Sequence, residues 1–368
     1  MRTLSIYNYR HIRVQFILKY EMGESKHMNI YPIIRKINDT PEMVSDRELI
    51  YLIKLQVSKA NLDNISRTKA YAQFFQEHPE IKWAFLASMV SRNAGWNMCD
   101  LEGEWYPKLL SKPFRYQLFL TYERANWLIF QDAFPQLLVY HYMTIVKRNL
   151  FHIFPLFHVS QFMVREWQEF FQHKNEERLL FALIVNEQHL IQKPVIENPV
   201  FKHRVFKTKL FGLQDSFHYS CVLFPTLAGR LYGSSVSEFR KHEERIKLGK
   251  RLASILFTPA LFPQFLAFSK HTEPTGSRWE YEQYQINKPF RTTPFLRLTF
   301  PVIYHTIENP DTCNWEKYYR VKRKWRLPVL PDKNMDVTDW FEGKQFEMKA
   351  FISFEQAIHW RRKQKKHK

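Results

Sequence analysis

The stretch Asn64–Glu104 reads NISRTKAYAQFFQEHPEIKWAFLASMVSRNAGWNMCDLEGE, and the rest of the chain is expected to pack around it or extend from it. Asn64 or Ser66 can cap a first helix, because short polar side chains accept hydrogen bonds from free backbone N–H groups. Pro79 restarts the chain, and the apolar residues that follow it repeat at helical spacing. The stretch therefore predicts two helices, with Gly95 as the expected end of the second.

The composition favours helices over strands. The chain has 368 residues, of which 45% are hydrophobic and 16% aromatic, so it can bury a sizeable core. Its 9 glycines are too few for the tight turns that a many-stranded fold uses. We expect a mainly α protein, with a multi-helix core of about 8–12 helices and a less regular basic C-terminal region.

The cysteines and the N-terminus indicate a cytoplasmic protein. Cys99, Cys221 and Cys313 lie far apart without CxxC spacing, which predicts neither a disulfide framework nor a zinc site. The N-terminus lacks an unbroken apolar segment of the signal-peptide type. The uncharged run Leu252–Ser269 contains two prolines and is short for a membrane span, so we expect a buried bent helix or a helical hairpin there.

Four strings of residues resemble a known family. They are SRTKAY (66–71), HPEIKWAFLASMVSRNAGWNM (78–98), ANWLIFQDAFPQLLVY (125–140) and TGSRWEYEQY (275–284). In this order they are similar to the YppC-like family of Bacillus-type bacteria, a domain of unknown function. The resemblance implies membership and carries no activity with it.

The resemblance and the composition together divide the chain. Residues 1–44 are expected to be an N-terminal extension and residues 286–368 a proline-punctuated basic C-terminal region. Between them we expect a helical domain, 45–285, with its core at 61–192 and a basic second lobe at 193–285. Residues 191–368 carry 32 Lys and Arg against 17 Asp and Glu, whereas residues 61–190 carry 13 of each.

Two Ser-Arg pairs near the ends of the predicted helical hairpin suggest an anion site. Arg67 and Arg92, together with Asn93, could bind a phosphate or carboxylate, because guanidinium groups donate two parallel hydrogen bonds. The alternative is that both arginines pair with internal carboxylates and only stabilise the fold. The candidate internal partners are Asp100, Glu123, Asp132 and Glu187.

Carboxylates among apolar residues are the candidates for acid–base chemistry. Glu123 and Glu187 lie in aromatic or aliphatic runs, where a carboxylate is either paired or has a raised pKa. No metal site or cofactor is predicted; Glu166, Glu169 and His173 have the spacing of a solvated helix face.

A basic cluster near the C-terminus is the candidate surface for nucleic acid or an anionic membrane. Its positive residues are Lys317, Arg320, Lys322, Arg323, Lys324 and Arg326, and Arg361 and Arg362 follow in the tail. Trp315, Tyr318, Tyr319 and Trp325 lie among them, a mixture that can neutralise phosphates and stack bases. The alternative is charge that serves solubility.

The sequence thus supports three hypotheses. The first is a cytoplasmic helical protein that binds an anionic partner, with nucleic acid preferred, through its basic C-terminal half. The second is an enzyme that acts on a small anionic substrate at the Arg/Asn/Glu cluster. The third is a structural or membrane-surface protein that binds a partner through an exposed aromatic patch, for which Phe257–Phe268 is the candidate.

Overall fold

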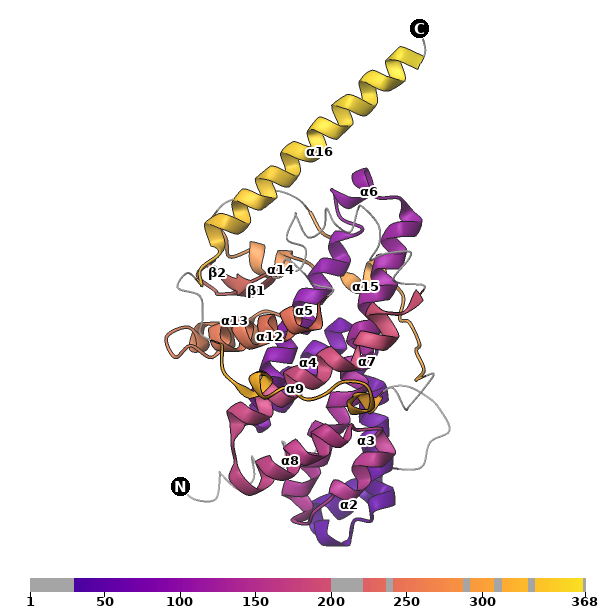
Figure 1. The fold of residues 1–368 in the computed structure, drawn as a ribbon, viewed down its shortest axis with the longest axis vertical. Coiled ribbons are helices and arrows are strands. Elements are labelled where there is room, and N and C mark those ends of the chain that lie inside the picture. Colours follow the sequence, from indigo (N-terminus) through magenta and orange to yellow (C-terminus); the bar gives the residue numbers. More distant parts are fainter. Residues whose placement is uncertain are drawn as a thin grey trace.

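Helices dominate the computed structural model, which describes residues 30–199, 221–235, 241–286, 292–307, 313–329 and 335–366 (Figure 1). The prediction of a mainly α fold is confirmed, and ten of the described α-helices are nine residues or longer. The α-helices are α2 (Tyr31–Asp39), α3 (Asp46–Ala60), α4 (Asn64–Glu77), α5 (Lys82–Asp100), α6 (Tyr106–Leu109), α7 (Lys112–Val146), α8 (Gln161–His173), α9 (Glu176–Leu190), α12 (His242–Leu256), α13 (Phe262–His271), α14 (Trp279–Glu282), α15 (Leu296–Thr299) and α16 (Thr338–Lys366).

Helices α4 and α5 form the predicted hairpin. The cap of α4 is Asp63, whose Oδ1 accepts from the Ser66 N–H at 2.7 Å, so the predicted capping by Asn64 or Ser66 is wrong by one to three residues. Across the hairpin, the Ser88 hydroxyl donates to the Thr68 carbonyl oxygen at 2.9 Å. Small polar side chains at the contact let the two backbones approach closely.

Helix α5 continues past Gly95 to Asp100, so the predicted helix end at this glycine is wrong. Gly95 instead allows close packing against a distant turn. A Cβ at position 95 would lie 3.3 Å from the Cα of Gly276, tighter than ordinary van der Waals contact. The close contact with Gly276 accounts for a glycine at position 95. The neighbouring sequence does not distinguish such a glycine from one that ends a helix.

A proline inside a helical run usually kinks or breaks the helix, but α7 passes through Pro135 as one helix of 35 residues. Proline removes one backbone hydrogen bond from a helix interior. Phe134 and Leu137 on either side are almost fully buried, and burial on both sides of the proline stabilises the continuous helix.

The uncharged run Leu252–Ser269 forms the end of α12, a turn and most of α13, which is the predicted helical hairpin. Phe265 and Phe268 are buried, and the remaining aromatic side chains of this run are half-buried against the core. The exposed aromatic patch expected there is therefore absent. Among the described helices, none is long and apolar enough to cross a membrane.

Two short antiparallel strands, β1 (Val222–Pro225) and β2 (Leu231–Ser234), form the described sheet. In their register Val222 pairs with Ser234 and Pro225 with Leu231. The sheet and α12 pack against α5, and α12 also packs against α9.

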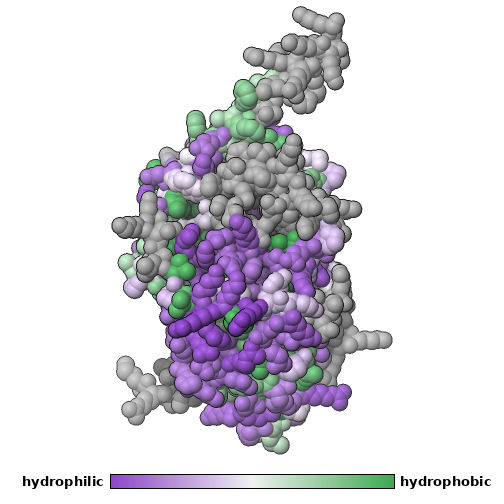
Figure 2. Space-filling model, viewed as in Figure 1, coloured by the Kyte–Doolittle hydropathy of each residue, from purple (hydrophilic) through white to green (hydrophobic). Residues whose placement is uncertain are grey.

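The described surface is hydrophilic across the middle of the face shown in Figure 2. Helix α16 extends away from the body of the molecule (Figure 1). Met348 and Ile352, towards the middle of this helix, are buried, while Phe346 and Phe354 are exposed.

Candidate functional site

Arg67 is held by a buried ion pair. It lies on the first turn of α4, and its guanidinium binds both oxygens of Glu123 on α7, with Nη1 at 2.9 Å from Oε2. Nε donates to Asn61 Oδ1 at 2.6 Å, and Nη1 also donates to Asn64 Oδ1 at 2.7 Å. The Arg67 and Glu123 side chains are 1% and 4% exposed. The pair with Glu123 is one of the internal pairings that the sequence suggested. Together with the bonds to Asn61 and Asn64, it gives every nitrogen of the guanidinium a hydrogen-bond acceptor.

Beside this pair lies a cleft of about 350 Å³ between α7 and the segment that contains α15. Its walls are mostly apolar, and the Phe119 and Phe300 rings stack with their centroids 3.9 Å apart. The cleft is lined by Leu62, Asp63, Met98, Phe119, Glu123, Leu296, Arg297, Phe300, Pro301 and Val302. A concave, largely apolar pocket with a few polar groups is the usual form of a small-molecule site.

Arg297 is the exposed cation of the cleft. Its Nε donates to Asp63 Oδ2 at 2.7 Å, and its Nη2 donates to Ser66 Oγ at 3.0 Å. In the part of the chain that the structure describes, the Arg297 Nη1 group makes no hydrogen bond, and 56% of the side chain is exposed. Burial raises the pKa of Asp63, but the hydrogen bonds from Arg297 and Ser66 outweigh it and hold this pKa below its ordinary value.

Glu123 supplies the acceptor of the cleft. Each of its oxygens accepts a hydrogen bond from Arg67, which leaves further acceptor capacity on a carboxylate that lines the cleft. Burial raises the pKa of Glu123 above its ordinary value, and the charge of Arg67 opposes that rise. The cleft thus has one guanidinium donor, Arg297, and two carboxylates, of which Asp63 accepts from Arg297 and Ser66 and Glu123 accepts from Arg67.

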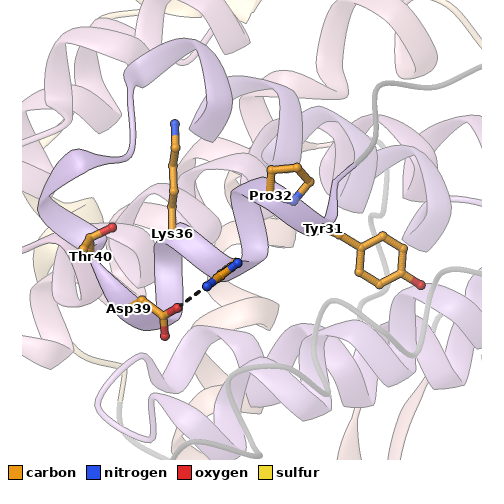
Figure 3. A pocket seen from close by; sticks show the side chains of 6 residues that line it. Tyr31, Pro32, Lys36, Asp39 and Thr40 are labelled. Carbon is orange, nitrogen blue, oxygen red and sulfur yellow. Dashed lines mark hydrogen bonds and ion pairs between the residues drawn. The ribbon is translucent and has the colours of Figure 1, made fainter.

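A second hollow, of about 550 Å³, lies against α2 (Figure 3). Its described lining residues all fall between Tyr31 and Thr40, so within the described residues a single helix and its end form it. Arg35 and Asp39 beside it pair with each other at 3.4 Å and are largely exposed. Since no second element of the described chain closes this hollow, it makes a weaker candidate than the cleft.

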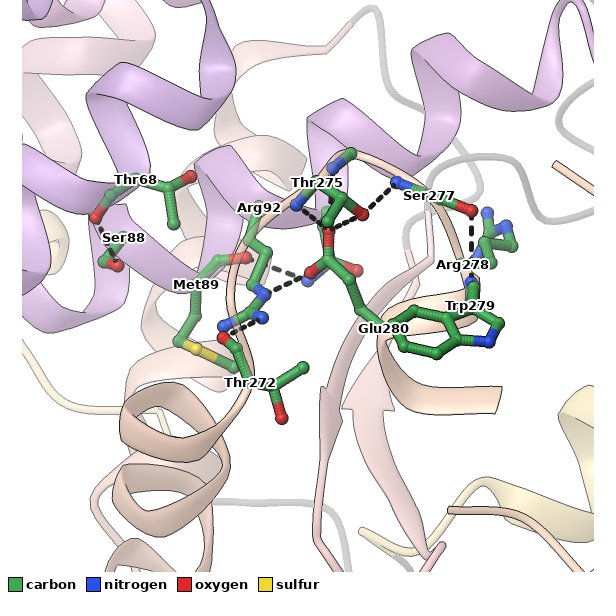
Figure 4. A network of polar contacts seen from close by, with 12 residues as sticks. Thr68, Ser88, Met89, Arg92, Thr272, Thr275, Ser277, Arg278, Trp279 and Glu280 are labelled. Carbon is green, nitrogen blue, oxygen red and sulfur yellow. Dashed lines mark hydrogen bonds and ion pairs between the residues drawn. The ribbon is translucent and has the colours of Figure 1, made fainter. Parts of the chain in front are cut away.

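Arg92 lies in a different buried network (Figure 4). Its Nε donates to Glu280, and its Nη2 donates to the Thr272 carbonyl oxygen. Glu280 also accepts from the backbone N–H groups of Thr275 and Gly276 at 2.6 and 2.7 Å. Arg92 therefore attaches the turn that precedes α14 to helix α5. Its partner, Glu280, is not among the four carboxylates that the sequence suggested.

A parallel ion pair joins the same two regions. Arg278 donates through Nε to Asp100 Oδ2 at 2.8 Å and through Nη1 to the Tyr281 hydroxyl at 2.9 Å. The sequence suggested Asp100 as a partner for Arg67 or Arg92, but in the structure Asp100 pairs with Arg278.

Asn93 binds backbone. Its Oδ1 accepts from the Leu223 N–H at 2.8 Å, and its Nδ2 donates to the Leu223 and Met89 carbonyl oxygens at 2.8 and 2.9 Å. Asn93 therefore attaches β1 to α5. Arg67, Arg92 and Asn93 each have separate partners, and the structure does not bring them together around one ligand position.

Glu187 accepts from the Trp83 indole N–H at 3.2 Å, and loss of hydration raises its pKa to about 7. Asp132 is buried, and its Oδ2 accepts from Gln136 and Asn186 at 2.8 and 2.7 Å. Burial raises the pKa of Asp132 to about 7. Neither Glu187 nor Asp132 lines the cleft, so Glu123 is the candidate acid that the cleft contains.

The tryptophans of the basic cluster point into the protein. Trp315 is buried, stacks on His189 at 4.1 Å, and donates its indole N–H to Asn186 at 2.8 Å. Trp325 is also buried, whereas Tyr318 is exposed. The two tryptophans that could have stacked on bases instead attach this segment to the helical body.

The six basic side chains of the cluster are exposed: Lys317, Arg320, Lys322, Arg323, Lys324 and Arg326. Lys322 and Lys324 both pair with Glu243, the latter at 2.7 Å. Arg326 pairs with Glu166 at 2.6 Å. Internal acids therefore offset part of the positive charge. Arg361 and Arg362 lie on the last turns of α16, and their side chains fall outside the described residues.

The expected solvated face on α8 is only partly solvated. Glu166 is buried and accepts from Arg178 at 2.6 Å as well as from Arg326. Glu169 also pairs with Arg178, at 2.6 Å, and His173 is exposed. The expectation for Glu166 is wrong because arginines on two other segments cover it.

Comparisons with known proteins establish the family. The chain belongs to the family described as "Protein of unknown function (DUF2515)", which matches residues 59–342 and so includes every residue that lines the cleft. The "Uncharacterized protein YppC" of Bacillus subtilis (strain 168) is 47% identical over 318 residues, which make up 86% of this chain and 98% of that protein. The predicted family is confirmed. No solved structure matches the chain.

Two residues of the cleft, Asp63 and Arg297, were not predicted as site residues from the sequence. Asp63 and Arg297 are 234 positions apart, and Arg297 lies in a region expected to be irregular. One sequence feature could have drawn attention to Asp63, because it stands directly before α4 at the N-cap position.

Proposed function

We propose that this protein binds a small molecule in the cleft beside Glu123 and Arg297. The observation that carries the proposal is a mostly apolar cleft of about 350 Å³ whose lining includes the Arg297 guanidinium, which Asp63 holds in place, and the Glu123 carboxylate. The ligand class follows from these groups. A small carboxylic acid with an apolar body and a hydrogen-bond donor would place its carboxylate at Arg297 Nη1 and its donor at Glu123.

The roles of the surrounding residues differ in this proposal. Glu123 and Arg297 contact the ligand. Arg67 acts through Glu123: its two hydrogen bonds fix the carboxylate plane and oppose protonation. Asp63 orients Arg297 and does not need to touch the ligand. Of the two acid–base candidates in the enzyme hypothesis, Glu123 and Glu187, only Glu123 lines the cleft. The proposal assigns no reaction to it.

A panel of apolar amino acids, hydroxy acids and aromatic acids tests the proposal. Binding is measured by ligand-observed NMR and by the shift of the thermal unfolding midpoint. Arg297→Gln should weaken binding about tenfold or more, because it removes a charge-assisted hydrogen bond worth roughly 1.5–3 kcal/mol. Arg230→Gln is the matched control, since Arg230 also pairs with an aspartate, Asp336 at 2.7 Å, and is 49% exposed.

Two results would overturn the proposal. One is that no member of the panel binds the wild-type protein. The other is that the same ligand binds wild type, Arg297→Gln and Glu123→Gln with equal affinity, which would place the site elsewhere. Circular dichroism of each variant establishes that the fold is intact before the affinities are compared.

A second candidate function is nucleic-acid binding in the cytoplasm. The specific observation is that segment 313–329 is attached by two buried tryptophans and exposes all six of its basic side chains. The three free cysteines, all buried, suit a reducing compartment. Arg320 and Arg323 are the side chains to change, because Lys322, Lys324 and Arg326 already have acidic partners.

The double variant Arg320→Gln/Arg323→Gln tests this surface at low salt with single-stranded DNA and RNA. If both arginines contact phosphates, affinity falls and the slope of log K against log salt decreases by about 1.4, at roughly 0.7 per phosphate. Unchanged retention would reject nucleic acid at this surface. Retention on vesicles of anionic lipid alone would assign the surface to a membrane instead.

A further inference from the structure

Three potential metal ligands meet between α4 and α7. Glu77 is the last residue of α4, His78 is its C-terminal cap, and His141 lies on α7. One ligand atom from each side chain lies within 4.8 Å of the other two. His78 Nε2 and His141 Nδ1 are 2.9 Å apart, and His141 Nδ1 is 3.6 Å from Glu77 Oε2.

These separations are close to those of a tetrahedral metal site. Zinc lies about 2.0–2.1 Å from histidine nitrogen and about 2.0–2.2 Å from carboxylate oxygen, so two ligands of one ion are about 3.3–3.4 Å apart. The observed separations of 2.9 and 3.6 Å lie on either side of that value. An ion would replace the proton shared by the two imidazoles and separate their nitrogens by about 0.4 Å.

A supporting hydrogen bond orients His78. Its other nitrogen, Nδ1, lies 3.2 Å from Glu80 Oε1, and the Tyr140 hydroxyl donates to that same oxygen at 2.9 Å. When Nδ1–H donates to Glu80, the lone pair of Nε2 faces His141. A carboxylate behind a ligating histidine is a regular feature of metal sites, because it fixes the tautomer and the ring orientation.

The cluster is accessible and separate from the cleft. The side chains of Glu77, His78 and His141 are 16%, 10% and 12% exposed, so each reaches the surface. The C-terminal end of α4 carries partial negative charge, which favours a cation. Glu123 and His141 lie on the same helix, and at 1.5 Å per residue they are about 27 Å apart along it.

We propose that Glu77, His78 and His141 bind one divalent first-row transition metal ion, with zinc as the expected occupant. Two imidazoles and one carboxylate are suitable ligands for zinc, and three protein ligands leave a fourth position for water. Glu80 is a positioning residue that acts through His78. The sequence predicts no metal here, because His141 is far from the other two ligands along the chain and no zinc-site spacing links them.

Zinc affinity of the untagged full-length protein tests the proposal. The chain has 15 histidines, so competition with a chelator of known affinity is needed to count tight sites only. We expect about one Zn²⁺ per wild-type chain. His141→Ala should weaken the affinity by more than tenfold, and Glu80→Gln should weaken it by about 10–100-fold, as for other residues behind a metal ligand.

His152→Ala is the matched control. His152 also contacts a carboxylate, Asp46 at 2.6 Å, but is not part of the three-residue cluster. The control should bind zinc as the wild type does. If His141→Ala folds poorly, Glu77→Gln replaces it, since the isosteric amide preserves packing while it removes the charge. A Co²⁺-loaded sample should show the visible absorption of tetrahedral cobalt and lose it in either variant.

Two results would overturn the proposal. One is wild-type zinc binding no tighter than that of His141→Ala or Glu77→Gln. The other is an equal loss of affinity in His152→Ala, which would indicate scattered surface histidines. In either case the two imidazoles would be only a hydrogen-bonded pair that joins α4 to α7.

Discussion

Removing Glu123 should destabilise the folded protein strongly. In the variant Glu123→Leu, Arg67 stays buried and charged without its carboxylate, because an arginine cannot lose its proton at ordinary pH. Removing one partner of a buried ion pair costs about 3–5 kcal/mol. With about 2.1 cal/mol/K of unfolding entropy per residue, a chain of 368 residues would unfold roughly 4–7 °C lower.

The double variant Arg67→Met/Glu123→Leu separates the ion pair from its surroundings. It removes both charges and should recover at least about 2 kcal/mol relative to the sum of the single variants, since apolar residues of similar volume often replace a buried ion pair without loss. Recovery should be incomplete. Asn61 and Asn64 would each lose a donor from Arg67, and an unpaired buried acceptor costs about 1–3 kcal/mol.

Urea unfolding, followed by tryptophan fluorescence and by circular dichroism, measures these differences. Lys82→Gln is the control: Lys82 pairs with Glu176 at 3.0 Å, both side chains are about two-fifths exposed, and its loss should cost less than about 1 kcal/mol. If Glu123→Leu costs no more than this control, the buried pair does not stabilise the fold and our account of Arg67 is refuted.

Two further predictions concern a turn and a buried acid. Gly276→Ala should destabilise the protein by more than about 2 kcal/mol, because φ at this position is +78° and a Cβ would lie 2.6 Å from the Cβ of Leu296. Gly343 has open space around it in α16, so Gly343→Ala should stabilise the protein by about 0.5–1 kcal/mol. Equal urea unfolding midpoints for the two variants would contradict this prediction. Burial raises the pKa of Asp132 from 3.8 to about 7, so the folded state holds an extra proton between about pH 4 and 7 and its stability falls as pH rises through that window. Relative to Asp132→Asn, wild type should lose roughly 2–3 kcal/mol of unfolding free energy between pH 5 and 8, and parallel urea profiles of the two proteins would contradict it.

Helical periodicity in the sequence was sufficient for the helical class and for the α4–α5 hairpin. The local stop signals at Gly95 and Pro135 were misleading, because tertiary packing overrides a single glycine or proline when both sides are buried. The family was recognised from strings of residues and not from any physical property of the chain.

The partners of buried charges were harder to predict. Glu123 was among the carboxylates considered for Arg67, because it lies in an aromatic run of the predicted helical core. Glu280 was not considered for Arg92, because 188 positions separate them and no periodic pattern links residues at that distance. The same limit applies to Arg297 in the cleft and to His141 in the proposed metal site.

Isothermal titration of the best panel ligand into wild type and Arg297→Gln, with Arg230→Gln alongside, tests the central claim most directly. The account predicts binding at a single site in wild type and in Arg230→Gln, and a dissociation constant at least about tenfold higher in Arg297→Gln. Equal dissociation constants in all three proteins, at equal helical content, would contradict it.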